Sequence, residues 1–163
     1  MKRIFYCFTK VFMPGISAKS KLVYIYLSRM ADFNAVSFPS RKTIAEACGL
    51  SVDSVKRAIK ELVLCGLIEK MERFTKDTGR QTSNVYRIVN EGAEPFFYLD
   101  SQVFSFEIPT NAKLVFTYIL RCSEDKGSCF PSLGEIATAC SLTVPTVQKH
   151  LKALVALGVI EKN

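Results

Sequence analysis

The chain has 163 residues, 48% hydrophobic and 23% charged, with 22 Lys and Arg against 15 Asp and Glu. This composition is that of an ordinary globular protein, and it excludes disordered, collagen-like and coiled-coil chains. No apolar run is long enough to span a membrane, and the apolar segment at residues 4–8 is too short for a secretory signal. We therefore expect a cytoplasmic protein with no membrane partner.

Positive charge is concentrated in one half of the chain. Residues 1–90 carry a net charge of +9, whereas residues 91–163 carry a net charge of −2. A basic half beside a slightly acidic half indicates that one half faces a polyanion and that the other half need not.

An internal repeat at an offset of 92 residues divides the chain. Residues 21–70 and 113–162 share 22 identities in 50 positions without a gap. A match of this length indicates two copies of one domain, and the polar stretch 90–95, which contains Gly and Pro, marks the boundary. We therefore predict a first unit over residues 1–92 and a second unit over residues 93–163.

Three helices are predicted in the first unit. The first helix begins near Ser17. The second spans residues 41–48, with Ser40 as its N-cap. The third follows the cap residue Ser51 and ends at Gly66, because glycine readily adopts the left-handed conformation that closes a helix. Two short helices joined by such a turn form a helix-turn-helix.

A β-hairpin is predicted after the third helix. Residues 67–74 and 85–89 have strand-like patterns, and the polar, basic residues 75–84 form the loop between them. Three helices followed by a basic hairpin describe a winged helix. In the second unit Lys162 corresponds to Lys70 and one residue follows, so that unit either works without a wing or belongs to a shortened chain. The predicted fold class is mainly α (α+β), with two tandem winged helix-turn-helix domains and a wing clear only in the first.

The sequence resembles the winged helix-turn-helix domains of bacterial plasmid and phage replication initiators and of DnaD-type primosome proteins. The resemblance covers nearly all of the first unit and about two-thirds of the second. It implies DNA binding, often at a replication origin, although related domains also regulate transcription. The segments that carry it are Lys21-Leu22-Val23-Tyr24, Phe38-Pro39-Ser40, Ile44-Ala45, residues 51–68 and Gln81-Thr82-Ser83-Asn84-Val85-Tyr86.

The predicted third helix has two stripes at helical spacing. The apolar stripe, expected to face the core, consists of Val52, Val55, Ile59 and Leu62. The exposed stripe consists of Asp53, Lys56, Arg57 and Lys60. Arg57 suits the acceptors of guanine in a major groove, and the two lysines suit phosphates. Asp53 either accepts a hydrogen bond from a cytosine amino group or only interacts favourably with the helix dipole. For the whole stripe, the alternative is a basic face that is simply solvated.

Two further elements of the first unit offer contacts to DNA. The N-terminus of the second helix has free backbone N–H groups that favour a phosphate. The basic wing tip is suited to contact the phosphate backbone or the minor groove of DNA. The alternative interpretation is an ordinary exposed turn without a binding role. With the helix caps, these elements add Ser40, Arg41, Lys42, Ser51, Ser54, Lys76 and Arg80.

The third helix of the second unit is less basic. Its apolar stripe consists of Val144, Val147, Leu151 and Leu154. Its candidate DNA contacts are Thr143, Thr146, Gln148, Lys149 and Lys152, of which Gln148 can read adenine. We expect this unit to bind DNA more weakly than the first, and a docking or dimerisation module is an equal alternative.

No catalytic, metal or cofactor site is predicted. The six cysteines form no closely spaced pair and His150 is the single histidine, so we expect reduced, mostly buried thiols and a histidine on the helix surface or in packing. The chain has neither a phosphate-binding Gly loop nor a zinc-protease motif. The repeated aromatics are expected in the core of each domain and not in a base-stacking platform. They are Phe12, Phe104, Tyr26 and Tyr118.

The sequence therefore predicts a protein that binds double-stranded DNA without catalysis or cofactor. Replication initiation and transcription regulation of a bacterial mobile element both stay open as roles. Replication or transcription proteins, or a second copy in a homodimer, are possible further partners. The alternative is a protein–protein interaction scaffold built on winged helices. The tandem units can also act as an internal pseudo-dimer on two half-sites about one helical turn apart.

Overall fold

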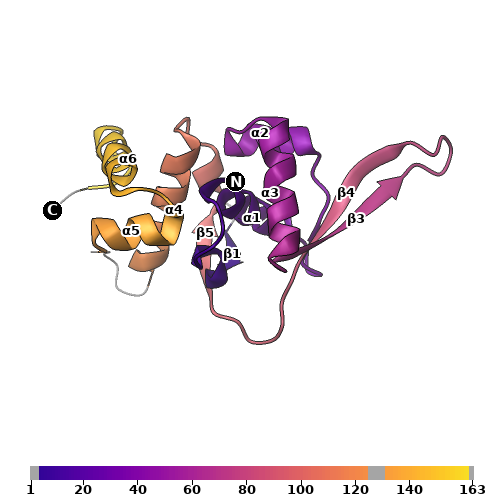
Figure 1. Ribbon diagram of the computed structural model, residues 1–163, viewed down its shortest axis with the longest axis horizontal. Coiled ribbons are helices and arrows are strands. Elements are labelled where there is room, and N and C mark those ends of the chain that lie inside the picture. The colour runs from indigo at the N-terminus through magenta and orange to yellow at the C-terminus, as the bar shows by residue number, and fades with distance from the viewer. Residues whose placement is uncertain (1–3, 125–130, 162–163) are drawn as a thin grey trace.

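The computed structural model describes residues 4–124 and 131–161 (Figure 1). The first unit contains β1 (Ile4–Phe8), η1 (Thr9–Phe12), α1 (Ala18–Met30), β2 (Val36–Ser37), α2 (Arg41–Cys48), α3 (Val52–Leu64), β3 (Ile68–Phe74) and β4 (Gln81–Ile88). The second contains β5 (Phe96–Asp100), η2 (Ser101–Phe104), α4 (Thr110–Ser123), α5 (Leu133–Cys140) and α6 (Val144–Ala156). The predicted fold class is confirmed, with three helices in each unit among the described residues. Lys162 lies outside them.

Serine caps open the three helices of the first unit, as predicted for Ser40 and Ser51. The side chains of Ser17, Ser40 and Ser51 each accept a hydrogen bond from the backbone N–H three residues ahead. Gly66 follows α3 and adopts a φ of +75°, so a glycine in the left-handed conformation ends this helix. The helix-turn-helix boundaries therefore follow from local sequence signals.

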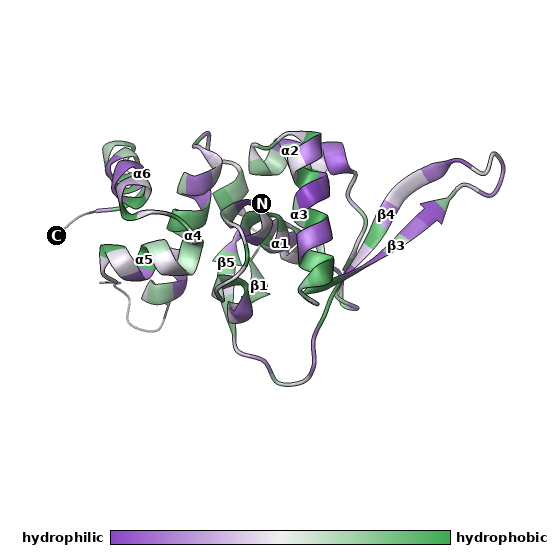
Figure 2. Ribbon diagram, in the orientation of Figure 1, coloured by the Kyte–Doolittle hydropathy of each residue, from purple (hydrophilic) through white to green (hydrophobic). Residues whose placement is uncertain are grey.

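The wing is a three-stranded sheet in the order β2-β4-β3. Strand β4 begins at Gln81, which pairs with Phe74, so the prediction of a loop over residues 75–84 was wrong for residues 81–84. Polar residues occupy the strand on both faces, and even buried Asn84 is polar, so hydropathy does not separate strand from loop here. Figure 2 shows the outer part of the wing as mainly hydrophilic.

The apolar stripes of α3 and α6 are shorter than predicted. Val55 and Leu62 of α3 are buried, but Val52 is 40% exposed. The equivalent Val144 of α6 is 38% exposed. Both valines are the first residue of their helix. Helical spacing gives the direction of a side chain but not whether a neighbouring element extends far enough to cover it.

The apolar segment at residues 4–8 forms a strand that joins the two units. It pairs antiparallel with β5, and Tyr6 faces Tyr98 at the centre of the ladder. One face of this strand pair is buried, through Phe5, Cys7, Phe97 and Leu99. The buried residues of both units consequently form one hydrophobic cluster. The chain boundary between residues 92 and 93 stays a prediction.

The repeated aromatics lie between the units and not in two separate cores. Phe12 of the first unit packs edge-to-face on Tyr118 of the second, with ring centroids 5.0 Å apart. Tyr26 of the first packs in the same way on Phe104 of the second, at 5.1 Å. The prediction that these aromatics belong to the core is confirmed, because Tyr26 is buried in the hydrophobic cluster and the other three pack against it. Repeated spacing marks equivalent positions in the two units. It does not tell whether those positions face inward or toward the other copy.

The buried titratable residues have packing roles. Cys7, Cys48 and Cys140 are free and buried, and burial raises the pKa of each thiol to about 12. His150 is also buried, and its burial lowers its pKa. In the described part of the chain no cluster of ligating side chains could hold a metal ion. No helix there is long and apolar enough to cross a membrane.

The contact between the units predicts an energetic coupling. In a double-mutant cycle of Phe12→Leu and Tyr118→Leu, we expect the free energies of unfolding to be non-additive by about 0.5–1.5 kcal/mol, because the two rings contact each other. Urea unfolding of the full chain measures it. The control cycle pairs Phe12→Leu with Tyr26→Leu and should be additive to within about 0.5 kcal/mol. Additivity in the first cycle would contradict the packing.

Candidate nucleic-acid interface

Helix α3 presents a charged face to solvent. Asp53, Lys56, Arg57 and Lys60 are all exposed, as the helical spacing predicts. The opposite face packs on α1. Figure 2 shows the alternation of hydrophilic and hydrophobic residues along α3. The core therefore fixes this helix from behind and leaves its cationic stripe free.

A hydroxyl network at the start of α3 orients the arginine of this stripe. The hydroxyl of Ser51 donates to Oγ of Ser54 at 3.0 Å, and Nη2 of Arg57 donates to the same Oγ at 3.2 Å. Ser54 itself is buried. The structure thus places Ser54 beneath the surface, where it positions Arg57 and is not itself available to a ligand.

A groove runs between α3 and the wing. It contains residues of α2, α3, β3 and β4, so four elements of the first unit converge on it. Its lining residues are Arg41, Lys56, Ile59, Lys60, Val63, Leu64, Lys70 and Asn84. Lys70 and Asn84 were not among the predicted contacts. Lys70 lies in a predicted strand, whereas Asn84 was predicted in the loop, and only the tertiary packing of the hairpin places both beside α3.

The cations of this groove have no acidic partners. Within residues 4–124 and 131–161, the ion pairs join Lys10 to Glu94 and Arg87 to Glu69, and neither pair lies in the groove. Unpaired cations on one surface create a positive potential that attracts a polyanion. Ile59, Val63 and Leu64 make much of the groove apolar, so phosphate groups would be stabilised at its basic side chains and not over its whole surface.

The N-terminus of α2 forms one side of the groove. Ser40 caps the helix and accepts from the backbone N–H of Thr43 at 3.0 Å. Arg41 is partly exposed and lines the groove, and Lys42 is exposed. The predicted basic N-terminus is therefore present, although the cap already satisfies one of its N–H groups.

An arginine that sequence reasoning missed, near the outer end of β3, connects the wing to the segment before α2. The guanidinium of Arg73 lies 4.9 Å from the ring centroid of Phe38, just before α2, and its Nε donates to the carbonyl of Ser83 at 2.8 Å. The predicted contacts Lys76 and Arg80 are exposed in the loop beyond. The tip of the wing projects away from the second unit (Figure 1).

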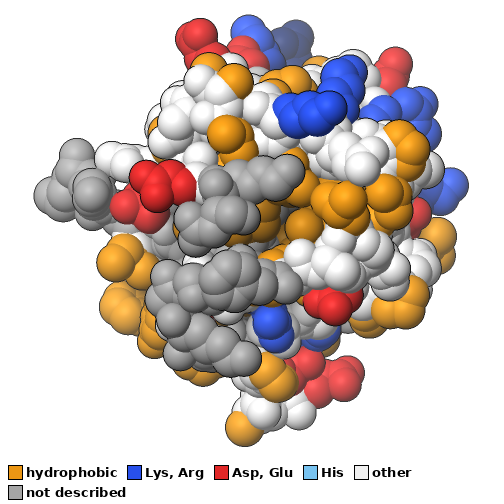
Figure 3. Space-filling view, turned by 90° about the vertical axis from the view of Figure 1, so that its left-hand side faces the viewer, with side chains coloured by type: hydrophobic (Ala, Val, Ile, Leu, Met, Phe, Trp, Pro, Cys, Tyr) orange, Lys and Arg blue, Asp and Glu red, His pale blue; other side chains and the backbone are white. Residues whose placement is uncertain are grey.

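Helix α6 presents the equivalent stripe with fewer charges. Gln148, Lys149 and Lys152 are exposed. Thr143 caps the helix by accepting from the N–H of Thr146, and their hydroxyls are 2.9 Å apart. At the end of the molecule that the second unit forms, basic side chains lie scattered among acidic and hydrophobic ones (Figure 3). No wing follows α6 within the described residues.

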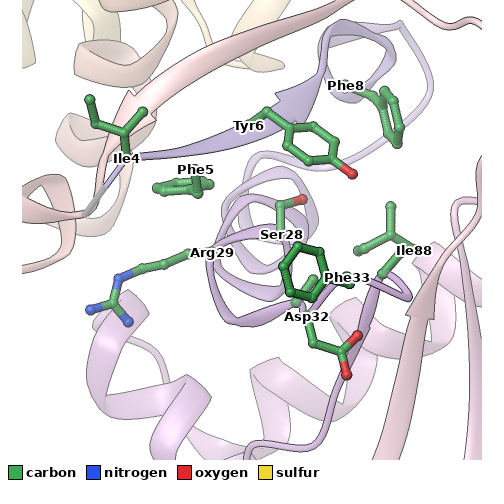
Figure 4. A pocket seen from close by; sticks show the side chains of 11 residues that line it. Ile4, Phe5, Tyr6, Phe8, Ser28, Arg29, Asp32, Phe33 and Ile88 are labelled. Atoms are coloured by element: carbon green, nitrogen blue, oxygen red, sulfur yellow. The ribbon is translucent and has the colours of Figure 1, made fainter.

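A separate hollow lies beside β1, the end of α1 and the loop that follows (Figure 4). Phe5 and Tyr6 come from β1, Arg29 from α1, and Phe33 from the loop. Phe33 is fully exposed. None of the predicted DNA contacts lines this mainly apolar hollow, which is therefore distinct from the groove beside α3.

Comparison with known families agrees with this architecture. The helix-turn-helix domain family matches the chain twice, over residues 15–68 and 107–160. The two matches together cover more than half of the chain, and each contains the three helices of one unit. No curated protein and no solved structure matches the chain. The chain therefore belongs to the helix-turn-helix domain family and contains two copies of that domain.

Proposed function

We propose that the protein binds duplex DNA sequence-specifically, with α3 of the first unit in the major groove. Arg57 hydrogen-bonds to a guanine, while Lys56 and Lys60 contact phosphates. The N-terminus of α2 and the wing contact the backbone on either side of that groove. The protein acts by binding alone, without catalysis and without a cofactor.

The observation that carries this proposal is the groove between α3 and the wing. It brings Arg41, Lys56, Lys60 and Lys70 together, and none of these has an acidic partner among the described residues. Exposed cations beside a protruding helix with a solid hydrophobic back match both the charge and the shape of a DNA groove.

The resemblance to plasmid and phage initiators supports a biological role on a bacterial mobile element. We propose that the protein acts there in replication initiation or in transcription regulation, with the corresponding protein machinery as a further partner. Permanganate reactivity of thymines beside the bound site separates the two roles. Local opening of the duplex supports initiation, and an unopened duplex supports regulation.

A protein-interaction scaffold is the second candidate function. The outer face of the β1–β5 pair supports it, because Tyr6, Phe96 and Tyr98 are each about half exposed, beside fully exposed Phe33. Apolar surface of this kind is typical of protein contacts. A complex with another protein that persists at high salt, together with no DNA binding, would favour the scaffold.

Replacing Arg57 with Ala tests the proposed groove contact. We expect a loss of about 1–3 kcal/mol in binding free energy on the best site selected from a randomised duplex pool, with relaxed preference at one base pair. Fluorescence anisotropy measures the affinity, and repeated selection measures the preference. Lys19→Ala is the control, because Lys19 is exposed on α1 and does not line the groove. Unchanged affinity and preference for Arg57→Ala would reject the assignment.

Replacing Lys76 with Ala tests the wing. Because a phosphate contact releases counterions, we expect weaker binding to all sequences alike, with the slope of log affinity against log salt concentration reduced by about 1. Salt titration by anisotropy on selected and random duplexes measures this slope. A loss confined to the selected duplex, or an unchanged slope, would show that the wing tip does not contact phosphate.

A further inference from the structure

The two units are related by an approximate two-fold axis. Tyr98 is the counterpart of Tyr6 in the 92-residue repeat and is also its partner in the strand pair, which extends two residues to either side. An antiparallel pair in which a residue faces its own counterpart has a two-fold axis at that point. In Figure 1 this strand pair lies between the helices of the first unit and those of the second.

The side-chain contacts across the axis are reciprocal. Nζ of Lys21 donates to the carbonyl of Ala139 in α5 at 2.7 Å. Nζ of its counterpart Lys113 donates to the carbonyl of Ala47 in α2 at 2.9 Å. Both lysines are buried. The aromatic pairs described above are reciprocal in the same way. The arrangement is that of an isologous dimer made within one chain.

Hydroxyl contacts break the symmetry and favour pairing within the chain. Thr110 donates to the carbonyl of Gly49, and a Cβ on Gly49 would lie only 3.0 Å from that hydroxyl oxygen. Ser141, the counterpart of Gly49, donates to the carbonyl of Ile16. Both hydroxyls belong to the second unit, since Ala18 is the counterpart of Thr110. A dimer of two first units paired in this way would lack both of these hydroxyl hydrogen bonds. The contacts therefore favour pairing of the first unit with the second unit of the same chain.

The recognition surfaces stay free in this arrangement. The contacts between the units involve β1, η1, α1 and the end of α2 with their counterparts. Lys56 and Arg57 of α3 and Gln148 and Lys149 of α6 are exposed. The two surfaces also differ, because Lys56 corresponds to Gln148 and Asp53 to Pro145. Because α3 and α6 differ in sequence and are related by a two-fold axis, they fit two half-sites that differ in sequence and run in opposite directions.

We propose that a single copy of this chain reads an inverted repeat with two dissimilar halves. The first unit reads one half with α3 and adds backbone contacts through its wing. The second unit reads the other half with α6, where Gln148 pairs with an adenine and Lys149 and Lys152 contact phosphates. This inference rests on the proposed DNA binding of the first unit and adds the architecture of the target.

Selection from a randomised duplex pool with the full chain tests the proposal. We expect two different motifs in inverted orientation at a fixed spacing, and native mass spectrometry should show one chain on one duplex. Changing the second motif to a direct repeat, or scrambling it, should weaken binding about tenfold or more. A direct-repeat preference, two chains per site or two duplexes per chain would overturn the proposal.

A matched pair of variants assigns the second half-site. Gln148→Ala should relax the preference in the second motif alone and lower affinity about 5- to 100-fold. Gln102→Ala is the control, because it removes the same amide from an exposed position on η2. Circular dichroism verifies that both variants fold. If Gln148→Ala behaves like the control, the second unit does not read DNA, although the first still does. No duplex binding by the unaltered chain would instead reject the proposed function itself.

Discussion

The structure depends on two buried lysines whose acceptors lie in the other unit. Lys21 and Lys113 each lose most of their hydration, and burial lowers the pKa of both. A buried ammonium is tolerated only when it is hydrogen-bonded. Each lysine finds a carbonyl near the C-terminus of α5 or α2, where the helix dipole is negative. Each unit therefore completes the polar interior of the other, so the two copies form one folded body.

This constraint determines which surfaces remain for function. The units meet through the strand pair, α1, α4 and the ends of α2 and α5, so α3, α6 and the wing stay outside the contact. The first unit, which carries the positive net charge, lies with its wing at one end of the molecule, and the less basic second unit lies at the other end (Figure 1). Rigid packing behind α3 also holds Arg57 through Ser54, which reduces the conformational entropy lost when a ligand binds.

Much of the candidate site was accessible from the sequence because its signals are local. The caps Ser40 and Ser51 and the glycine at position 66 define the helices, and helical spacing places Lys56, Arg57 and Lys60 on one exposed face. Ser54 was placed with them, although burial makes it a support for Arg57. Lys70, Asn84 and Arg73 were missed, because their contacts with α3 and with Phe38 arise only when the hairpin packs beside the helices.

The sequence by itself determined the number of domains, their helices, the hairpin and the charge difference between the halves, because spacing, caps and composition act over short distances. Only the tertiary structure decided that residues 4–8 form a strand with residues 96–100 and that the repeated aromatics pair between units. The physical reason is that the sequence shows which apolar residues need to be buried, but it does not show which residues cover them. A repeat doubles the possible partners, and the packing of the whole chain selects among them.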